Sequence, residues 1–249
     1  MTSPSTRRLP AVLVSGVAAA LVLAGCTSTE EGSASPASTS AGSSAASSSA
    51  EGSTSTDDLT PGLLPEDAFG AGSVVTPLSE AELEQGASLG DLSGITITPE
   101  TCAQALQDSQ PGVEDLDAFA AQSATSGTSV VVELISTGGG QDDAVSSLAA
   151  AVATCPQATI SSPEVGTATV TFAVLEVPDL GDGSAALSYT TTVTGPDGST
   201  IAVPALVGLV ADGDRLVTLV STSLGGTVDQ AGFGTLLQQA YEFQADALD

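Results

Sequence analysis

The sequence contains neither histidine nor lysine, and its three cationic side chains are all arginine. Without histidine or lysine, the chain has no groups for Ser-His-Asp, Cys-His, Ser-Lys or Schiff-base chemistry, and no zinc site can be built on histidine. Tryptophan is absent and tyrosine occurs twice, so few aromatic rings are present against which a sugar could stack. These absences disfavour an enzyme, although paired carboxylates remain available for the hydrolysis of a glycoside.

The first 25 residues have the organisation of an export signal. Arg7 and Arg8 provide a positive start, and residues 11–23 form an almost purely apolar run. This run is too short to cross a bilayer as a helix, which takes about 20 residues. We therefore predict a cleaved signal peptide over residues 1–25 and not a transmembrane anchor.

The segment ends in Leu23, Ala24, Gly25 and Cys26, and this pattern resembles that of bacterial lipoproteins. The resemblance implies that Cys26 is diacylated, that the chain is cleaved before it, and that lipid anchors the protein at the outer face of the cell membrane. Two or three acyl chains hold a protein on a membrane far more stably than one. The alternative is an ordinary cleaved signal that happens to precede a cysteine.

Cleavage before Cys26 removes Arg7 and Arg8, and leaves Arg215 as the single cation against 30 Asp and Glu residues, a net side-chain charge of −29. Binding to phosphates depends on clustered lysine and arginine, so nucleic acid is excluded as a partner. The same charge repels an anionic membrane surface. The predicted lipid anchor therefore has to hold the protein on the membrane against this repulsion.

Residues 26–58 are predicted to be the lipidated Cys26 followed by a disordered linker. They are nearly all Ser, Thr, Ala and Gly with a few acids, and they cannot bury enough apolar surface to offset the entropy of ordering. A flexible coil of about 32 residues has a reach of roughly 30 Å. Residues 59–249 are long enough for a single domain with a hydrophobic core.

The first part of this domain is predicted to mix helices and strands. A capping box at residues 79–82 and the pair Thr98-Pro99 are each expected to open a helix. Residues 116–124 and 129–136 are predicted strands. Apolar residues spaced by three and four between Val145 and Cys155 predict a helix that follows a glycine-rich break.

From Gly166 onward, the hydrophobic period changes to two, which is typical of strands. Asp-Gly turns link predicted strands at residues 184–194, 199–210 and 215–223 into a meander, and Pro204 predicts a bulge or an edge. An apolar stripe over residues 233–248 predicts a C-terminal helix. The predicted class is α+β: an antiparallel sheet, with a meander in its C-terminal half, and helices packed on one face.

Cys102 and Cys155 remain once Cys26 is assigned to lipid. In an exported protein, two such thiols on the apolar stripes of two predicted helices indicate a disulfide. A loop of this length predicts a stabilisation of roughly 4 kcal/mol. The alternative is a pair of buried free thiols.

Several features together resemble the extracellular sensor domain of PknH-type actinobacterial kinases. These are the helix start from Pro99 to Cys102, a glycine-broken strand and helix that end in Cys155, the long meander and the terminal amphipathic helix. The resemblance covers about residues 60–248 and implies a sensor-like domain with a cleft for a ligand. Kinase members usually carry a second disulfide, which this chain lacks. Since no kinase domain is present, any sensing has to be relayed through another protein.

Three candidate sites follow from the residues. Arg215 is expected either to pair with Asp212 or Asp214 or to anchor an anionic ligand. The acidic turns at residues 179–183 and 212–214 lack the 12-residue loop of a strong calcium motif, and Asp and Gly are also what tight turns require. We therefore expect no metal, and no cofactor.

A threonine-rich face on two predicted strands is the third candidate, either simply solvated or a flat binding surface. Its residues are Thr167, Thr169, Thr171, Thr190, Thr192 and Thr194. From these observations we predict a non-enzymatic, lipid-anchored domain that binds a ligand, a cell-wall component or a partner protein. A carrier of lipid or another hydrophobic ligand is the first alternative, and a carboxylate-dependent cell-wall hydrolase is the second.

Overall fold

A computed structural model describes residues 58–88, 95–108, 115–138, 141–162, 166–195, 197–224 and 226–248. The predicted signal peptide, the predicted lipidation site Cys26 and nearly all of the predicted linker lie outside the described residues. No helix in the described part is both long and apolar enough to cross a bilayer.

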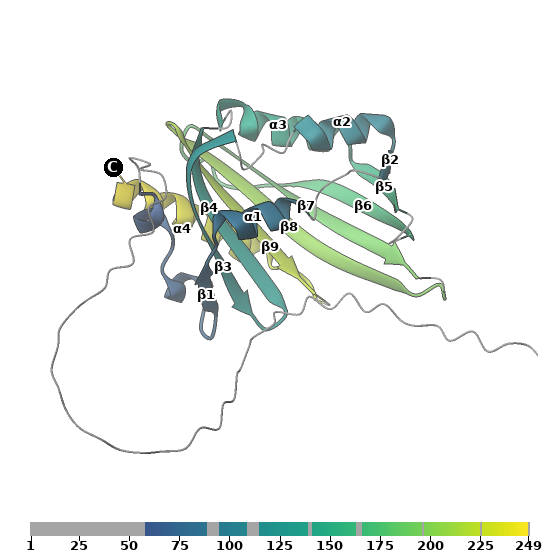
Figure 1. Cartoon of the computed structure of the whole chain (residues 1–249), viewed down its shortest axis with the longest axis horizontal. Coiled ribbons are helices and arrows are strands. Elements are labelled where there is room, and N and C mark those ends of the chain that lie inside the picture. The colour runs from purple at the N-terminus through teal and green to yellow at the C-terminus, as the bar shows by residue number, and fades with distance from the viewer. Residues whose placement is uncertain are drawn as a thin grey trace, which may run out of the picture. The chain divides into compact units, whose positions relative to one another are not determined.

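The architecture is a single antiparallel sheet of nine described strands with helices around it (Figure 1). The order of the strands across the sheet is β1-β3-β4-β9-β8-β7-β6-β5-β2. The strands are β1 (Val74–Pro77), β2 (Thr96–Thr98), β3 (Leu116–Ser126), β4 (Ser129–Gly138), β5 (Gln157–Ser162), β6 (Gly166–Leu175), β7 (Gly183–Thr194), β8 (Thr200–Asp212) and β9 (Arg215–Ser223). The helices are the short 3-10 turns η1 (Thr60–Gly62) and η2 (Glu66–Phe69), and α1 (Glu80–Ser88), α2 (Glu100–Asp108), α3 (Gln141–Thr154) and α4 (Gln230–Leu248).

The predicted meander is confirmed as β7, β8 and β9, which pair in sequence order. The β8–β9 turn has Gly213 at φ 61°, a left-handed conformation that glycine adopts at little cost. At the start of α1, the Ser79 backbone N–H and hydroxyl both donate to the Glu82 carboxylate, at 2.8 and 2.6 Å. The hydrogen bond from the backbone N–H is one of the two that a capping box predicts.

Helices α3 and α4 pack on opposite faces of the sheet, so the prediction that the helices share one face is not confirmed. Gly208 of β8 faces α4, because a Cβ on Gly208 would lie 2.8 Å from a methyl carbon of Leu237 and 3.1 Å from the Phe233 ring. Ala186 is the partner of Gly208 in β7 and therefore shares this face. The next residue, Leu187, points the other way and lines a small cavity with Leu148 of α3. We call these two surfaces the α4 face and the α3 face.

Two separate hydrophobic clusters result from this arrangement. The larger lies on the α4 face and contains thirteen buried residues: Leu59, Leu64, Ala120, Ile135, Leu180, Ala186, Leu206, Val210, Val217, Leu219, Phe233, Leu237 and Ala240. The smaller lies near α2, α3, β2 and β5 and contains four: Ile97, Cys102, Cys155 and Ala158. In Figure 1, α2 and α3 lie end to end along the top of the view, and α4 lies at the left.

Candidate binding sites

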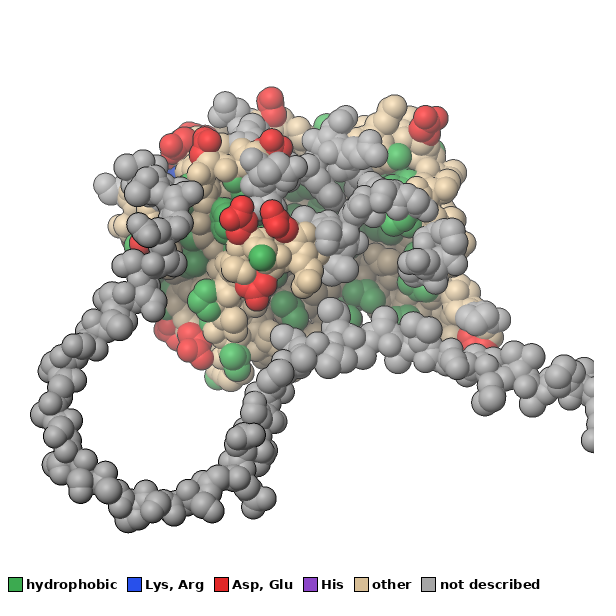
Figure 2. Space-filling view, in the orientation of Figure 1, with side chains coloured by type: hydrophobic (Ala, Val, Ile, Leu, Met, Phe, Trp, Pro, Cys, Tyr) green, Lys and Arg blue, Asp and Glu red, His purple; other side chains and the backbone are tan. Residues whose placement is uncertain are grey.

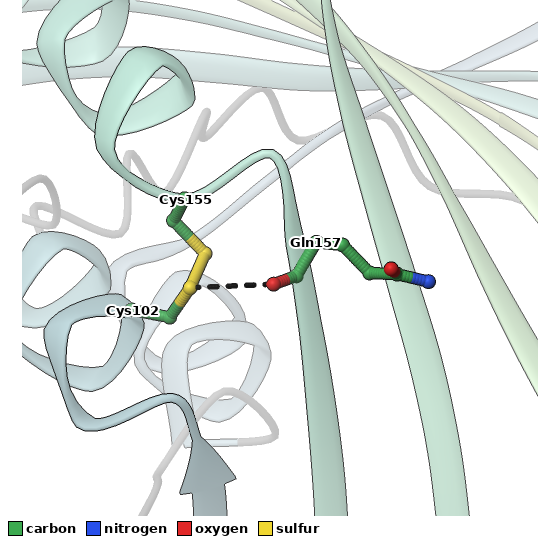
Figure 3. Close-up of a disulfide and its surroundings, with 3 residues drawn as sticks. All are labelled: Cys102, Cys155 and Gln157. Carbon is green, nitrogen blue, oxygen red and sulfur yellow. Dashed lines mark hydrogen bonds between the residues drawn. A yellow bond between two sulfur atoms is a disulfide. The ribbon is translucent and has the colours of Figure 1, made fainter.

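The disulfide joins α2 to the residue that follows α3 (Figure 3). The Cα atoms of Cys102 and Cys155 are 5.0 Å apart, and the two residues are 0% and 2% exposed. The Cys102 sulfur lies 3.5 Å from the carbonyl oxygen of Gln157 at the start of β5. The predicted disulfide is therefore confirmed, and the alternative of two free thiols is wrong.

Arg215 lies at the start of β9, where its side chain pairs with the preceding turn. Its Nη2 is 3.1 Å from Asp212 Oδ2, and the two side chains are 14% and 21% exposed. The same Asp212 oxygen accepts a 2.6 Å hydrogen bond from Nε2 of Gln244, a fully buried residue of α4. Asp212 thus links the β8–β9 turn to α4, and the predicted ion pair with Asp212 is present.

A groove of about 470 Å³ lies beside Arg215 and is lined by Asp58, Leu59, Pro61, Thr137, Asp214, Ala247 and Leu248 as well. An anion in this groove would meet the carboxylates of Asp58 and Asp214 next to the guanidinium. Such neighbours oppose the binding of an anion. The geometry favours a structural role for Arg215, and its role in ligand binding stays a prediction.

The two acidic turns predicted as weak calcium candidates lie side by side at this end of the sheet. The Asp182 backbone N–H donates to the Ala211 carbonyl, and the Gly213 N–H donates to Asp182 Oδ2, both at 2.8 Å. The aspartates therefore serve the turns themselves. Among the residues that the structure describes, no group of three or more Asp, Glu or Cys side chains is arranged to hold a metal ion.

The threonine-rich surface extends over more strands than the sequence indicates. The strand register aligns Thr98, Thr159, Thr169 and Thr192 across β2, β5, β6 and β7. These residues share the α4 face of the sheet, beyond the part that α4 covers. They are half-buried or exposed, and simple solvation accounts for them as well as binding does.

The α3 groove is an apolar groove of about 460 Å³ between α3 and the ends of β6 and β7. Its lining residues are Leu148, Ala149, Val152, Val174, Leu175, Glu176, Val177, Ser184, Ala185 and Ala186. Val174 is 65% exposed although it is a large apolar residue. Ligand pockets of proteins commonly have volumes of 300–1,000 Å³ and mainly apolar walls. This groove therefore has the size and the chemistry of a site for a hydrophobic ligand or partner.

One polar site of the structure escaped the predictions from sequence. Glu133 of β4 is completely buried and lies directly opposite Gln122 of β3, which is 7% exposed. Burial raises the pKa of Glu133 to about 7, although hydrogen bonds from Gln122 and Leu64 act to lower it. The feature of the sequence that could have revealed this site is a single acidic residue within the apolar run of residues 130–135.

Comparisons with known proteins identify similar structures but no family. No family model matches the sequence, and no curated protein matches it either. The extracellular domain of PknH from Mycobacterium tuberculosis is 12% identical with a TM-score of 0.42, over 74% of this chain and 93% of that domain. An uncharacterised Rv0999 orthologue from Mycobacterium smegmatis is 14% identical with a TM-score of 0.44, over 77% of this chain and 96% of that one. At this level of similarity, we draw no activity, ligand or partner from either.

Proposed function

We propose that the protein is a lipid-anchored, non-enzymatic domain at the outer face of the cell membrane, where it binds a hydrophobic ligand or partner in the α3 groove. The proposed binding role rests on two properties of this groove: its volume, and its apolar lining around the exposed Val174. The lipoprotein-like segment that ends at Cys26 supports the location. The disulfide supports it too, since disulfides persist in oxidising compartments.

Charge also favours the α3 groove as the binding surface. The chain carries 30 acidic residues, and Figure 2 shows acidic side chains at many places on the visible surface. Of the described residues that line the α3 groove, only Glu176 is charged. A partner bound there would contact an apolar surface with one carboxylate. The groove beside Arg215 has two carboxylates, those of Asp58 and Asp214.

The first experiment tests the anchor. The full-length protein and a Cys26→Ala variant are expressed in a bacterium that processes lipoproteins, with radiolabelled palmitate in the medium. We expect label and membrane association for the parent protein, and neither for the variant, because the cysteine sulfur is the predicted acylation site. Equal labelling of both proteins would show that Cys26 is not the site of lipidation.

The second experiment tests the α3 groove with a matched pair of positions. Val174 and Ile201 are 65% and 66% exposed, but Val174 lines the groove and Ile201 does not. A photoreactive benzophenone residue is introduced at each position in the lipidated protein, which is then irradiated in native membranes. We expect a cross-linked species for position 174 and none for position 201. Identical patterns at both positions would overturn the assignment of the groove.

A lipid carrier is the second candidate, because the α3 groove is apolar and could accept an acyl chain. The small cavity beside it, lined by Phe172, Leu187, Ala105, Cys155 and residues of α3, has a volume of about 30 Å³, which is far too small for an acyl chain. A carrier would therefore have to hold its cargo in the open groove. Mass spectrometry of an organic extract of the purified protein should show co-purified lipid for a carrier only.

The cell-wall hydrolase receives less support from the carboxylates of the structure. Asp58 and Asp214 line one groove together, but a general acid for glycoside hydrolysis needs a raised pKa. Hydrogen bonds from Thr60 instead lower the pKa of Asp58. Asp58 is therefore unsuited to the role of the general acid in this groove.

A further inference from the structure

The backbone of Leu64 is held by two polar side chains from the middle of the sheet. The Leu64 N–H donates to both carboxylate oxygens of Glu133, at 3.3 Å to Oε1 and 3.1 Å to Oε2. Nε2 of Gln122 donates to the Leu64 carbonyl at 2.8 Å and to Glu133 Oε2 at 2.7 Å. The two side chains thus bind the peptide groups on both sides of one residue, 69 positions away from Glu133 in the sequence.

Glu133 lies in a row of the sheet that is otherwise apolar or neutral. Its neighbours across the α4 face are Leu219 of β9 and, beyond it, Gly208 of β8. Glu133 and Leu219 are both completely buried, and Leu64 is 4% exposed. An ionised carboxylate at this position gives up its hydration and receives only neutral donors in exchange, which is unfavourable unless a cation compensates it.

The charged groups on the packed elements do not compensate an ionised Glu133. Arg215 lies on the same face of β9, but four residues from Leu219, and its ion pair is with Asp212. The remaining ionisable residues on the elements around Leu64 are acids and one phenol: Asp58, Glu66 and Asp67 on the N-terminal side, and Tyr241, Glu242 and Asp246 on α4. Asp67, Glu242 and Asp246 line a groove together with Leu64. Their negative charges add to the cost of ionising Glu133.

We propose that Glu133 and Gln122 form a protonation-sensitive clamp that holds residues 59–69 on the sheet, and that loss of the Glu133 proton loosens this segment. The clamped segment contributes Leu59 and Leu64 to the large cluster. Gly62 within it fits tightly, since a Cβ there would lie 2.8 Å from Leu248 and 3.0 Å from Ile135. The segment directly follows the predicted linker, so the clamp determines how much chain lies between the lipid and the body of the domain.

The direction of the pH response follows from the pKa of Glu133 in the two states. Burial raises this pKa to about 7 in the clamped state, and the ordinary value is 4.5. The clamped state therefore binds the proton more tightly, and protonation stabilises it. Clamping is strongest below pH 4.5, weakens as the pH rises towards 7, and changes little above that.

Hydrogen exchange on the full-length protein tests the clamp. Protection of peptides that cover residues 59–69 is measured between pH 5 and pH 8 and corrected for the intrinsic rate at each pH. We expect protection to fall roughly 40-fold between pH 5 and pH 7 and by roughly a further twofold between pH 7 and pH 8, where it levels off. In Glu133→Gln, which keeps the shape but does not titrate, this fall should be absent. Glu100→Gln, at an exposed acid of α2 in the disulfide region, should behave like the parent protein.

The same pH dependence in the parent protein and in Glu133→Gln would overturn the proposal. A second measurement on the parent protein covers the case in which Glu133→Gln does not fold. Carbon-13 NMR of the side-chain carboxyls should show one glutamate with a midpoint near pH 7, and the Leu64 amide signal should shift with the same midpoint. If the chemical shift of the Leu64 amide does not follow the titration of this carboxyl, the clamp is equally disproved.

Discussion

The two hydrophobic clusters of this domain are stabilised by different means. On the α4 face, thirteen buried residues pack together, and they come from the residues on either side of η1, the segment between β6 and β7, five strands and α4. Near α2, α3, β2 and β5, four residues are buried and two of them are the disulfide cysteines. The strands in this second region are also short, since β2 has three residues and β5 has six.

This difference shows how a domain stabilises a region that buries little apolar surface. A fully buried aliphatic side chain contributes about 1.5–3 kcal/mol, so four residues that include an alanine and two cysteines supply little. A covalent link acts instead on the unfolded chain, by restricting the conformations available to it. The α4 region should therefore depend on packing, and the disulfide region on the bond.

Removal of the disulfide should have the largest effect. Cys102→Ser and Cys155→Ser each open a loop with a sequence separation of 53 residues, which predicts a loss of about 4 kcal/mol in the free energy of unfolding. Urea unfolding of each variant measures this loss. Hydrogen exchange should show increased opening of β2, β5 and α2, while β8 and α4 stay protected. Equal loosening of both regions would contradict the division of the domain into two differently stabilised parts.

Leu237→Ala should have the next largest effect, in the other region. Leu237 is completely buried in α4 and faces Gly208 of β8, so its truncation leaves a cavity that costs about 3 kcal/mol. The disulfide does not offset this loss of stability, because it lies in the other cluster. Urea unfolding measures the loss, with Gln239→Ala as the control at an exposed position of α4. A cost below about 1 kcal/mol would show that packing is not what holds α4 on the sheet.

Much of the strand pattern could be predicted from sequence, because local signals specify it. Alternation and Asp-Gly turns predicted the meander of β7, β8 and β9. Pro204 was expected at a bulge or an edge, and the β8–β9 pairing indeed begins only at Ala205. The three-residue β2 and six-residue β5 were missed, since such short segments carry little periodicity.

The predicted placement of the helices on one face was not confirmed, for a reason that is visible in β8. Residues 205–210 are apolar or glycine without alternation, and such a run is typical of a strand covered on both faces. The sequence also contained a signal for the Glu133 site, namely an acidic residue within an apolar run. Its partner Leu64 could not be inferred, because no local pattern connects residues so distant in the sequence.

Substitution of Arg215 should have the smallest effect, and it tests whether polar links matter in the α4 region. Arg215→Gln removes the ion pair with Asp212, but the hydrogen bond from Gln244 to Asp212 remains. A partly exposed pair of this kind contributes at most about 1 kcal/mol, which corresponds to about 2–4 °C in Tm for a domain of this size. Thermal unfolding measures the shift, with Asp214→Asn, at the exposed neighbour, as the control. A shift well above about 4 °C would mean that charge, and not apolar packing, ties the β8–β9 turn to α4.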